Sequence, residues 1–456
     1  MHCRHLRTRG FIRKSFGDKS MKVEKLKPSE QLCKVMSRIY DSGLTTVSGG
    51  NLSLKDEYDN IWVTPSGGDK GRYQPEDMLK IGRDGKIQGT RKPSVETGIH
   101  RSILADRPEF KGVVHAHPSG LVAISLLRQL PETMLFPQVA NEVRNVRLAA
   151  YGCPGSEELR ANVAKEFKDN PTTNTAILEN HGAFVASEKG LSHAFGIFKD
   201  LDFSIRVQAK AHSFWGKGPN LISKEQLERY NRALRPALGT FKQGEISEKE
   251  RELRALMCDF CSRAYQRKLF TQNIGVISAR LEGENFLITE SDSDNAELTA
   301  SEIVKVCGST AEEGKTPSKS VLLHKRIYET NPDIHAIIMA APENAMVFAV
   351  TDREYDLKTI PECYIVLRED IAKFPFGSTI EKQEELADYF KRKSPVAIVK
   401  NDCYICTGEN LFNAFDRLEV VEFSAEAVMN ANLLKGQIKS ITEQQVHEIK
   451  VKFGIV

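Results

Sequence analysis

The stretch Val113-Val114-His115-Ala116-His117-Pro118 decides how the first part of this chain is interpreted. Its β-branched start predicts a strand over residues 111–117. Because side chains alternate along a strand, both histidines are expected on one face and Ala116 on the other. Two imidazoles one pleat apart can share a metal ion, and imidazole suits zinc. The stretch therefore predicts two ligands of a metal site.

The remaining ligands must come from other parts of the chain, because a catalytic zinc takes about three protein ligands and keeps one position open. His181, in Asn180-His181-Gly182, is the candidate third imidazole. Glu96, in Pro93-Ser94-Val95-Glu96, is the candidate carboxylate at the same metal. The competing interpretation is a chance pair of structural histidines. Pro118, the His–Gly pair and the nearby acid favour the metal.

Five short motifs follow one another in the order of a known family: Gly50-Asn51-Leu52-Ser53, Thr64-Pro65-Ser66-Gly67, Pro93-Ser94-Val95-Glu96, His115-Ala116-His117-Pro118 and Asn180-His181-Gly182. This set resembles the class II aldolase/adducin family, which contains zinc-dependent sugar-phosphate aldolases. The resemblance covers about Ser29 to Gly216, and a weaker echo covers the rest of the chain.

The resemblance implies an α/β fold, namely an αβα layered domain with a central mixed, largely antiparallel sheet. It implies Zn²⁺, or another divalent metal, on His115, His117 and His181, and Glu96 as the catalytic proton carrier. It also implies phosphate-binding residues, which here are Gly50, Asn51, Thr64, Ser66, Gly67 and Ser94. The family often has a second serine at the position of Val95.

The implied reaction is aldol cleavage of a phosphorylated ketose through a zinc-stabilised enediolate. A sugar-phosphate epimerase, a dehydratase or a decarboxylase on the same metal site is an alternative. A further alternative is a binding or scaffold protein of the adducin type, whose aldolase-like heads lack the metal set. The intact ligand set favours an enzyme in the first half of the chain.

Composition bounds the remaining possibilities. The 456 residues are 40% hydrophobic and 27% charged, as in ordinary globular proteins. A net charge of +3 gives no electrostatic footprint for nucleic acid, and no apolar run approaches the ~20 residues of a membrane helix. Nine irregularly spaced cysteines indicate a reducing compartment, so we expect a cytoplasmic protein that binds neither nucleic acid nor membranes.

Residues 1–28 are expected to form a disordered extension. Residues 1–20 carry six basic residues and one acid, a composition that also fits a transit peptide. Met21 looks like a natural start, which favours the extension. From residue 29 onward, helices are predicted over 32–41, 94–104 with Ser94 as N-cap, 121–130, 157–167 and 191–211. Strands are predicted over 61–64, 111–117, 175–178 and 183–186.

The pattern then repeats at an offset of 221–225 residues, which predicts a duplicated fold. We expect one domain over 29–238, a polar linker over 239–249 and a second domain over 250–456. The repeat places Met339, Ala341, Asp402 and Ser320 where the first copy has its histidines and its acid. A thioether and an acid do not hold zinc as three imidazoles do, so the second copy is expected to be silent.

The repeat also sorts two further features. His100 has a counterpart, His324, in the silent copy, so we interpret it as mainly structural. The basic loop with Lys70 and Arg72 maps to Asn295 and Glu297. The loop of the second copy has become acidic and would repel a phosphate.

Two Cys-x-x-Cys pairs, at 258/261 and 403/406, are interpreted as buried free thiols, because a strand would turn the second pair to opposite faces. Since the family's site lies between subunits, we expect the second half to pack beside the first as a pseudo-subunit and line its site. Two chains would then form a homo-oligomer with the symmetry of a pseudo-tetramer.

Overall fold

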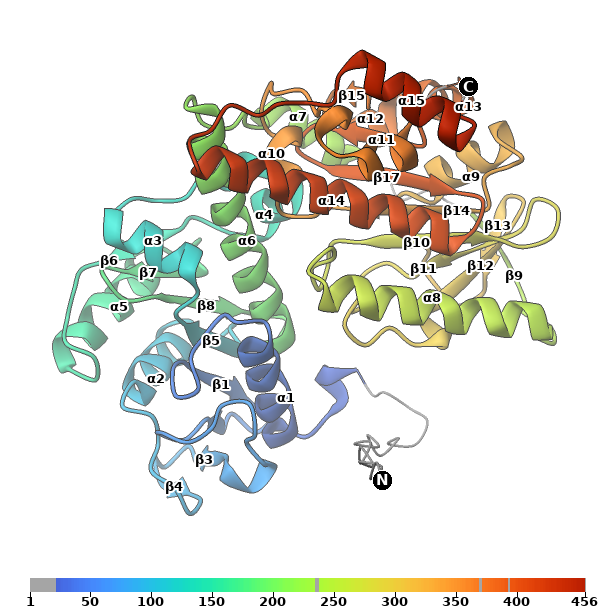
Figure 1. The fold of residues 1–456 in the computed structure, drawn as a ribbon. Coiled ribbons are helices and arrows are strands. Elements are labelled where there is room, and N and C mark those ends of the chain that lie inside the picture. Colours follow the sequence, from blue (N-terminus) through green and yellow to red (C-terminus); the bar gives the residue numbers. More distant parts are fainter. Residues whose placement is uncertain (1–21, 234–237, 369–370, 393, 456) are drawn as a thin grey trace, which may run out of the picture.

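The computed structural model describes residues 22–233, 238–368, 371–392 and 394–455, which form two halves, each built on one sheet (Figure 1). The first half contains η1 (Val23–Lys25), α1 (Pro28–Asp41), β1 (Asn51–Lys55), β2 (Ile61–Val63), η2 (Pro75–Asp77), β3 (Leu79–Ile81), β4 (Ile87–Gln88), α2 (Thr97–Asp106), β5 (Gly112–Ala116), α3 (Ser119–Leu127), η3 (Thr133–Leu135), α4 (Pro137–Glu142), β6 (Arg147–Ala149), α5 (Glu157–Asp169), β7 (Thr175–Leu178), β8 (Ala183–Ser187), α6 (Leu191–Trp215) and α7 (Lys224–Arg232).

The second half repeats this order with two differences: it begins with a strand in place of η1, and the short helix α12 is added before α13. It contains β9 (Gly239–Phe241), α8 (Glu248–Gln266), β10 (Val276–Arg280), β11 (Phe286–Thr289), η4 (Ala300–Glu302), β12 (Ile303–Cys307), β13 (Thr310–Glu312), α9 (Val321–Thr330), β14 (Ala336–Ala340), α10 (Met346–Ala349), η5 (Leu357–Thr359), α11 (Pro361–Leu367), β15 (Lys373–Phe374), α12 (Ser378–Glu381), α13 (Gln383–Arg392), β16 (Val396–Val399), β17 (Cys403–Gly408), α14 (Leu411–Leu433) and α15 (Glu443–Phe453).

The two sheets have the same topology. The first runs β4-β3-β2-β1-β5-β8-β7-β6, and the second runs β13-β12-β11-β10-β14-β17-β16-β15 with β9 added beside β13. All neighbours are antiparallel except β6/β7, β15/β16 and β13/β9. The registers agree too, since Asn51 lies opposite His115 where Val276 lies opposite Met339. The predicted duplication and the mixed, largely antiparallel sheet are confirmed.

Helices cover both faces of each sheet, which confirms the αβα layers. On the first sheet, α2 and α5 pack on one face, and α1 and α6 pack on the other. The five residues of β5 are all buried, as expected for a strand in the middle of a sheet with both faces covered. This position puts any side chain on β5 inside the molecule.

The halves share one hydrophobic core. A continuous buried cluster contains Phe198 and Leu201 of α6 together with Val347 of α10 and Leu418 of α14. Helix α6 contacts both α10 and α14, and in Figure 1 it runs up from the first sheet toward the second half. The second half therefore packs beside the first, as a pseudo-subunit would.

The structure corrects four local expectations. Residues 239–241, expected in the linker, form β9 and pair with β13. In the expected N-terminal extension, residues 1–21 lie outside the described residues, but Val23 is buried in the shared core. Ser94 is not a helix N-cap, because α2 begins at Thr97 with Glu96 as the capping position. The metal strand ends at Ala116, so His117 stands one residue beyond it.

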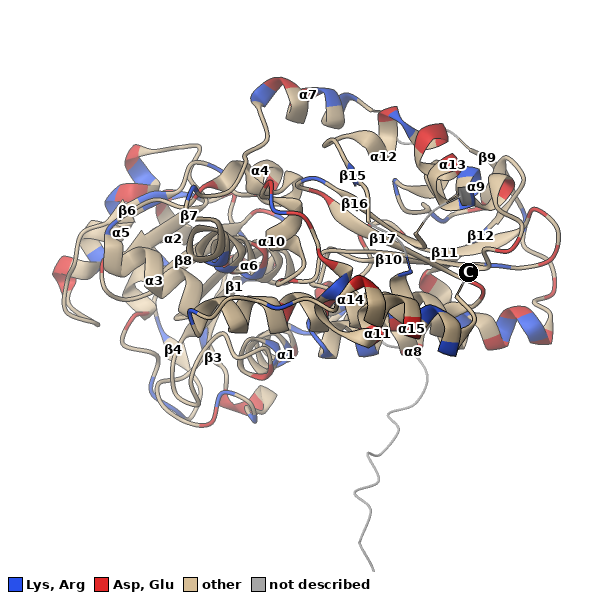
Figure 2. Ribbon diagram, turned by 45° about the horizontal axis from the view of Figure 1, so that its top comes forward, with Lys and Arg blue, Asp and Glu red and all other residues tan. Residues whose placement is uncertain are grey.

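The surface is mixed in sign, with acidic and basic residues interspersed along outer helices such as α7 and α8 (Figure 2). Among the described residues, no helix combines the length and apolar composition that a membrane crossing needs. The eight described cysteines are free. Cys403 and Cys406 belong to different hydrophobic clusters, as expected for alternate faces of β17.

Candidate metal centre

His115 is fixed from three sides. It lies on β5 between Asn51 of β1 and Phe184 of β8, and its ring stacks on Phe184 with centroids 4.2 Å apart. Its Nδ1 lies 3.0 Å from the carbonyl of Ala183. A carbonyl only accepts, so Nδ1–H donates and Nε2 is turned toward the site. A hydrogen bond of this kind sets which nitrogen of a histidine can bind a metal.

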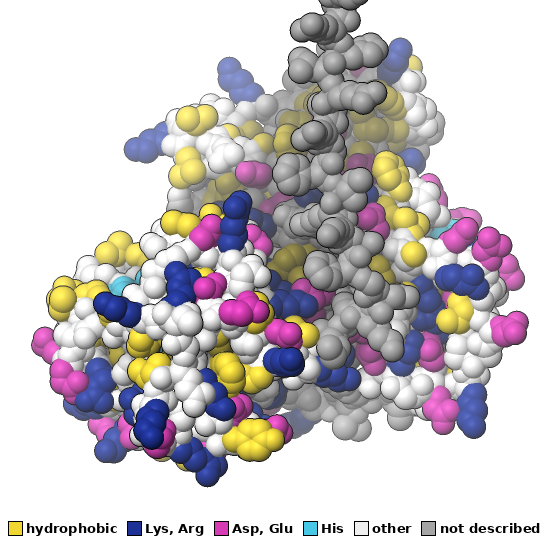
Figure 3. Space-filling view, turned by 90° about the horizontal axis from the view of Figure 1, so that it is seen from below, with side chains coloured by type: hydrophobic (Ala, Val, Ile, Leu, Met, Phe, Trp, Pro, Cys, Tyr) yellow, Lys and Arg dark blue, Asp and Glu magenta, His cyan; other side chains and the backbone are white. Residues whose placement is uncertain are grey.

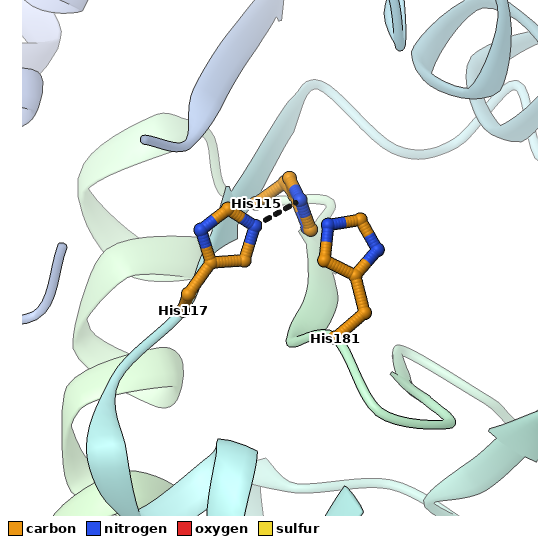
Figure 4. A group of neighbouring side chains, drawn as sticks. All are labelled: His115, His117 and His181. Atoms are coloured by element: carbon orange, nitrogen blue, oxygen red, sulfur yellow. Dashed lines mark hydrogen bonds between the residues drawn. The ribbon is translucent and has the colours of Figure 1, made fainter. Parts of the chain in front are cut away.

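His117 and His181 come to the same point from two loops (Figure 4). The Nε2 atoms of His117 and His115 are 3.0 Å apart, and the rings of His117 and His181 stack with centroids 4.8 Å apart. One ligand nitrogen from each of the three histidines lies within 4.8 Å of the others. The structure therefore brings together all three imidazoles that the sequence singled out.

The turn between β7 and β8 explains why Asn180 and Gly182 flank His181. Asn180 adopts a left-handed conformation with φ of 56°, which asparagine tolerates better than most residues. A Cβ atom at Gly182 would lie 2.5 Å from the carbonyl oxygen of Ala116 and 2.7 Å from the His117 ring. Only glycine lets this turn approach the end of β5 closely enough to bring His181 to the other two histidines.

Glu96 faces the imidazoles from the start of α2. Its Oε2 lies 3.2 Å from Nε2 of His115, and its Oε1 lies 3.7 Å from Nε2 of His181. Asn51 donates to Oε2 at 2.6 Å, whereas the buried Oε1 accepts no hydrogen bond. Burial alone would raise the pKa of Glu96, but His115, Asn51 and His181 outweigh it and hold this pKa well below its usual range.

These groups fit a divalent cation. Nε2 atoms and carboxylate oxygens face one another within a few ångströms, and one buried carboxylate oxygen has no hydrogen-bond partner. A cation would satisfy all of these acceptors at once. Three imidazoles with an open position and an adjacent carboxylate form a donor set typical of catalytic zinc.

A second layer of side chains fixes Glu96. Nε2 of His100 donates to Oδ1 of Asn51 at 2.5 Å, and Nδ1 of His100 accepts from Oγ of Ser53 at 2.7 Å. These contacts orient the Asn51 amide so that its NH₂ group faces Glu96. Burial lowers the pKa of His100 to about 3, so the ring is neutral. His100 is structural, as expected, but it also positions Glu96 through Asn51. The sequence signal for this positioning role was the spacing of four residues between Glu96 and His100, which places both on one face of a helix.

The expected phosphate residues divide into two groups. Ser66 and Gly67 are exposed on a loop that the Pro65–Pro93 bridge holds beside Ser94. The remaining residues make contacts that stabilise the fold. The hydroxyl of Thr64 accepts from the backbone N–H of Leu52 at 3.0 Å.

Gly50 and Lys70 also serve the fold. A Cβ atom at Gly50 would lie 2.7 Å from the carbonyl oxygen of His115. Lys70 is buried beneath the 64–67 loop, where Nζ contacts the Pro65 carbonyl and the Tyr73 hydroxyl. Burial lowers the pKa of Lys70 to about 8. The basic loop in the sequence suggested an exposed charge at Lys70. The structure shows instead that this charge is enclosed.

The silent site of the second half differs in its surroundings. Ser320, Met339 and Asp402 line a cavity of about 1,050 Å³ between the two halves, to which Glu142, His193 and Tyr230 of the first half also contribute. By contrast, the three histidines make their hydrogen bonds, ion pairs and ring contacts within the first half, as far as the described residues go. Within one chain the cavity between the halves thus opens onto the second half's altered site. The expectation that the chain's own second half lines the histidine site is not supported.

Comparison with known families agrees with this geometry. The profile of the class II aldolase and adducin N-terminal domain matches residues 30–209 and 255–429. The chain belongs to this family. Both matched segments lie inside the halves that the sequence suggested, 29–238 and 250–456, and the chain is a tandem pair of class II aldolase domains.

Individual relatives are metabolic enzymes. The chain is 31% identical over 182 residues to 3-oxo-tetronate 4-phosphate decarboxylase of Escherichia coli, covering 39% of this chain and 84% of the relative. It is 29% identical over 192 residues to 5-methylthioribulose-1-phosphate/5-deoxyribulose-1-phosphate aldolase of Rhodospirillum rubrum, covering 41% and 81%. L-fuculose-1-phosphate aldolase from Thermus thermophilus has 26% identity and a TM-score of 0.36, covering 42% and 96%. The named sequence relatives, a decarboxylase and an aldolase, show that the chain is an enzyme of the class II aldolase type.

Proposed function

We propose that the first half cleaves a carbon–carbon bond in a phosphorylated ketose, with a divalent metal, zinc, held by His115, His117 and His181. The observation that carries the proposal is the Glu96 carboxylate. It is buried against the converging imidazoles and has one oxygen without a hydrogen-bond partner. A bound zinc ion would supply Lewis acidity beside the substrate carbonyl.

Glu96 is the group that moves the proton. Oε2 is occupied by Asn51, so the free Oε1 gives or takes the proton at the substrate carbon from which the bond breaks. Asn51 and His100 hold the carboxylate in place without exchanging protons themselves, since one is an amide and the other is a buried neutral ring. Orientation of this kind is a large part of what an enzyme contributes.

The exposed loop of Ser66 and Gly67, with Ser94 beside it, is the proposed phosphate site. A Cβ atom at Gly67 would meet nothing within 4 Å, so the loop is open to a ligand. Short polar side chains and accessible backbone N–H groups suit an anion. Asn51 begins β1, which pairs with β2 just ahead of this loop, and its amide contacts Glu96. The phosphate end and the reacting end of one substrate would therefore lie side by side along β1.

Decarboxylation of a phosphorylated 3-oxo acid is the second candidate, because one relative carries that activity in its name. Both reactions break a carbon–carbon bond next to a carbonyl and leave negative charge that the same groups would stabilise. They differ only in whether an aldehyde or carbon dioxide departs.

The test is product analysis of the zinc-loaded full chain with a panel of ketose 1-phosphates and 3-oxo acid phosphates. Release of an aldehyde supports the aldolase, and release of carbon dioxide supports the second candidate. A product of unchanged mass, or one that has only lost water, would replace both with an epimerase or a dehydratase. We further propose a cytoplasmic location, since all described cysteines are free thiols. We also propose a homo-oligomer, because the family resemblance implies a site between subunits.

A further inference from the structure

The cavity between the two halves has the size of a small-molecule site. Its volume is about 1,050 Å³. Helices α4, α6 and α7 of the first half line it, together with the loops at the ends of β10, β11 and β16 of the second half. Among the described residues that line it, neither Glu96 nor any of the three clustered histidines is found. The cavity is therefore separate from the candidate metal centre.

One loop of this cavity has changed its charge relative to the first half. The loop that carries Pro65 and Gly67 in the first half carries Glu290 and Asp292 in the second. An equivalent isolated β-bridge holds each loop in place, so the two loops correspond in structure as well as in sequence. A loop that is open to an anion in the first half has thus become acidic in the second.

The whole lining of the cavity is acidic. Nine of the described residues that line it are aspartate or glutamate, and four are lysine. The open surface differs, because acidic and basic side chains are interspersed on the face drawn in Figure 3. A cleft lined mainly by one sign of charge concentrates ions of the other sign. The cavity therefore favours a cation over an anion.

Asp200 on α6 is a buried acid in the wall of the cavity. It is 5% exposed, and burial raises its pKa to about 6. Its Oδ2 accepts from Nδ2 of Asn273 at 3.3 Å, whereas its buried Oδ1 accepts no hydrogen bond. Lys199 also acts on this pKa, but its Nζ lies over the Tyr265 ring, 3.8 Å from the centroid. The structure thus leaves one oxygen of a buried carboxylate without a donor.

The fold does not require an acid at this position. At an offset of 220 residues, α6 aligns with α14, so that Phe195 corresponds to Phe415 and Asp200 to Val420. A valine therefore serves the same helix position in the second half. The structural alternative is that Asp200 only holds the loop of Asn273, but that role uses Oδ2 and leaves Oδ1 unexplained.

The second half contributes two more acceptors to the same cavity. Nε2 of Gln272 donates to the hydroxyl of Ser192 at 3.1 Å, whereas its buried Oε1 accepts no hydrogen bond. Asp402, which stands where the first half has His181, is 7% exposed and accepts from the hydroxyl of Thr379 at 3.0 Å. Hydroxyl and amide groups supply hydrogens but no charge. A cation would balance the charge of both buried carboxylates, which water would not do.

The other walls of the cavity suit a carbon chain. Tyr230 stacks on Phe376 with centroids 5.0 Å apart, and an aromatic face attracts an organic cation. Burial and the nearby Asp402 carboxylate raise the pKa of Tyr230 well above its usual value. Aliphatic side chains from both halves also line the cavity, namely Ile197, Ile274, Leu322 and Ile380. A metal ion alone would leave these apolar walls unused.

We propose that the cavity between the halves binds an aliphatic diamine, with one ammonium group at Asp200 and Gln272 and the other at Asp402. An ammonium group brings three N–H donors and one positive charge to these acceptors. The carbon chain between the two groups lies along the apolar walls. The altered site of the second half is then a binding site of its own, which requires neither the metal nor the reaction proposed for the first half.

Isothermal titration calorimetry of the full chain with putrescine and cadaverine, diamines of four and five carbons, tests the proposal. We expect one diamine to bind per chain. Butanediol keeps the carbon chain of putrescine but lacks its charges, and it should not bind. Glycerol phosphate and Mg²⁺, which stand for an anion and for a metal ion, should not displace the diamine.

Two variants remove one charge each and keep the shape of the side chain. Asp200→Asn and Asp402→Asn should each weaken diamine binding at least about tenfold, because each loses a charge-assisted hydrogen bond. The matched control is Glu343→Gln. Glu343 pairs with Arg206 and Lys210 across the halves, but it does not line the cavity. This control should bind the diamine as the wild type does.

Binding should also persist in His117→Ala, which separates the cavity from the candidate metal centre. If Asp200→Asn does not fold, the comparison of Asp402→Asn with Glu343→Gln decides. The absence of binding at millimolar diamine, wild-type affinity in the aspartate variants, or displacement by glycerol phosphate or Mg²⁺ would overturn the proposal. None of these measurements records turnover, so a negative result here is distinct from a failure of the proposed reaction.

Discussion

Oε2 of Glu96 lies 3.2 Å from Nε2 of His115, and both atoms are buried. The pair joins the start of α2 to the central strand β5 and places a carboxylate against an imidazole that is held by the Ala183 carbonyl and the Phe184 ring. The other oxygen of Glu96 is left without a hydrogen bond. From this arrangement we propose that the histidines bind the metal and that the acid transfers the proton.

Glu96→Gln is predicted to retain the metal and to lose most turnover. The amide preserves the shape of the side chain but cannot take a proton. General acid–base groups typically contribute about 10²–10⁴-fold. Steady-state kinetics on the substrate found in the product screen, with metal content measured on the same sample, gives the answer. Near-normal turnover in this variant would show that another group moves the proton.

His100→Gln is predicted to lower turnover about 10–100-fold, the range for residues that orient a metal site's first ligands. The control is His324→Gln, because His324 makes the equivalent contact with Ser278 in the silent half. Both variants remove a buried ring and should lose similar stability in thermal unfolding. Only the first should lose turnover, and equal loss in both would mean that His100 acts through folding alone.

Gly182→Ala is predicted to abolish metal binding and to lower the melting temperature. The added Cβ meets the Ala116 carbonyl and the His117 ring at distances that no real structure tolerates, so the turn must move. Gly190→Ala is a useful comparison, since open space surrounds that position, although its positive φ carries some strain of its own. Metal retention in the Gly182 variant would contradict the close approach described for the β7–β8 turn.

Asp402→Asn is predicted to flatten the pH dependence of stability between about pH 4 and pH 6. Burial raises the pKa of Asp402 to about 6, partly offset by the hydroxyl of Thr379. The native state therefore holds a proton that the unfolded chain has lost, and the free energy of unfolding falls as pH rises through this window. The effect is at most about 3 kcal/mol. Urea unfolding at several pH values measures it, and an unchanged slope in the variant would contradict the assignment.

The sequence alone predicted the three-histidine cluster because short local motifs contain its residues. His115 and His117 follow a β-branched run, and His181 precedes an obligatory glycine. The duplication was predicted for a similar reason, since paired positions survive at a nearly constant offset. These positions could be recognised in the sequence because they are buried, and a central strand tolerates few kinds of side chain.

Other features depend on packing that no local pattern records. Serine is a residue type that favours the N-cap position, but α2 begins three residues after Ser94. Glu96 takes the capping position and faces the site. Lys70 sits in a loop that suggests exposed charge, yet the Tyr73 ring and the Pro65 carbonyl enclose it. The segment 239–249 is mostly polar, but its first three residues pair with the edge of the second sheet as β9. The sequence also could not predict which of the two sites faces the other half of the chain, because this depends on how the halves pack together.

Metal content per chain tests the central claim most directly, by elemental analysis of the gently purified full-length protein. The account predicts one divalent ion per chain, zinc, in the wild type and none in His117→Ala, which should keep its fold. It predicts an unchanged content in His335→Ala, an exposed histidine of the second half. Two ions per chain, none in the wild type, or full retention in His117→Ala would contradict a single metal centre on the three histidines of the first half.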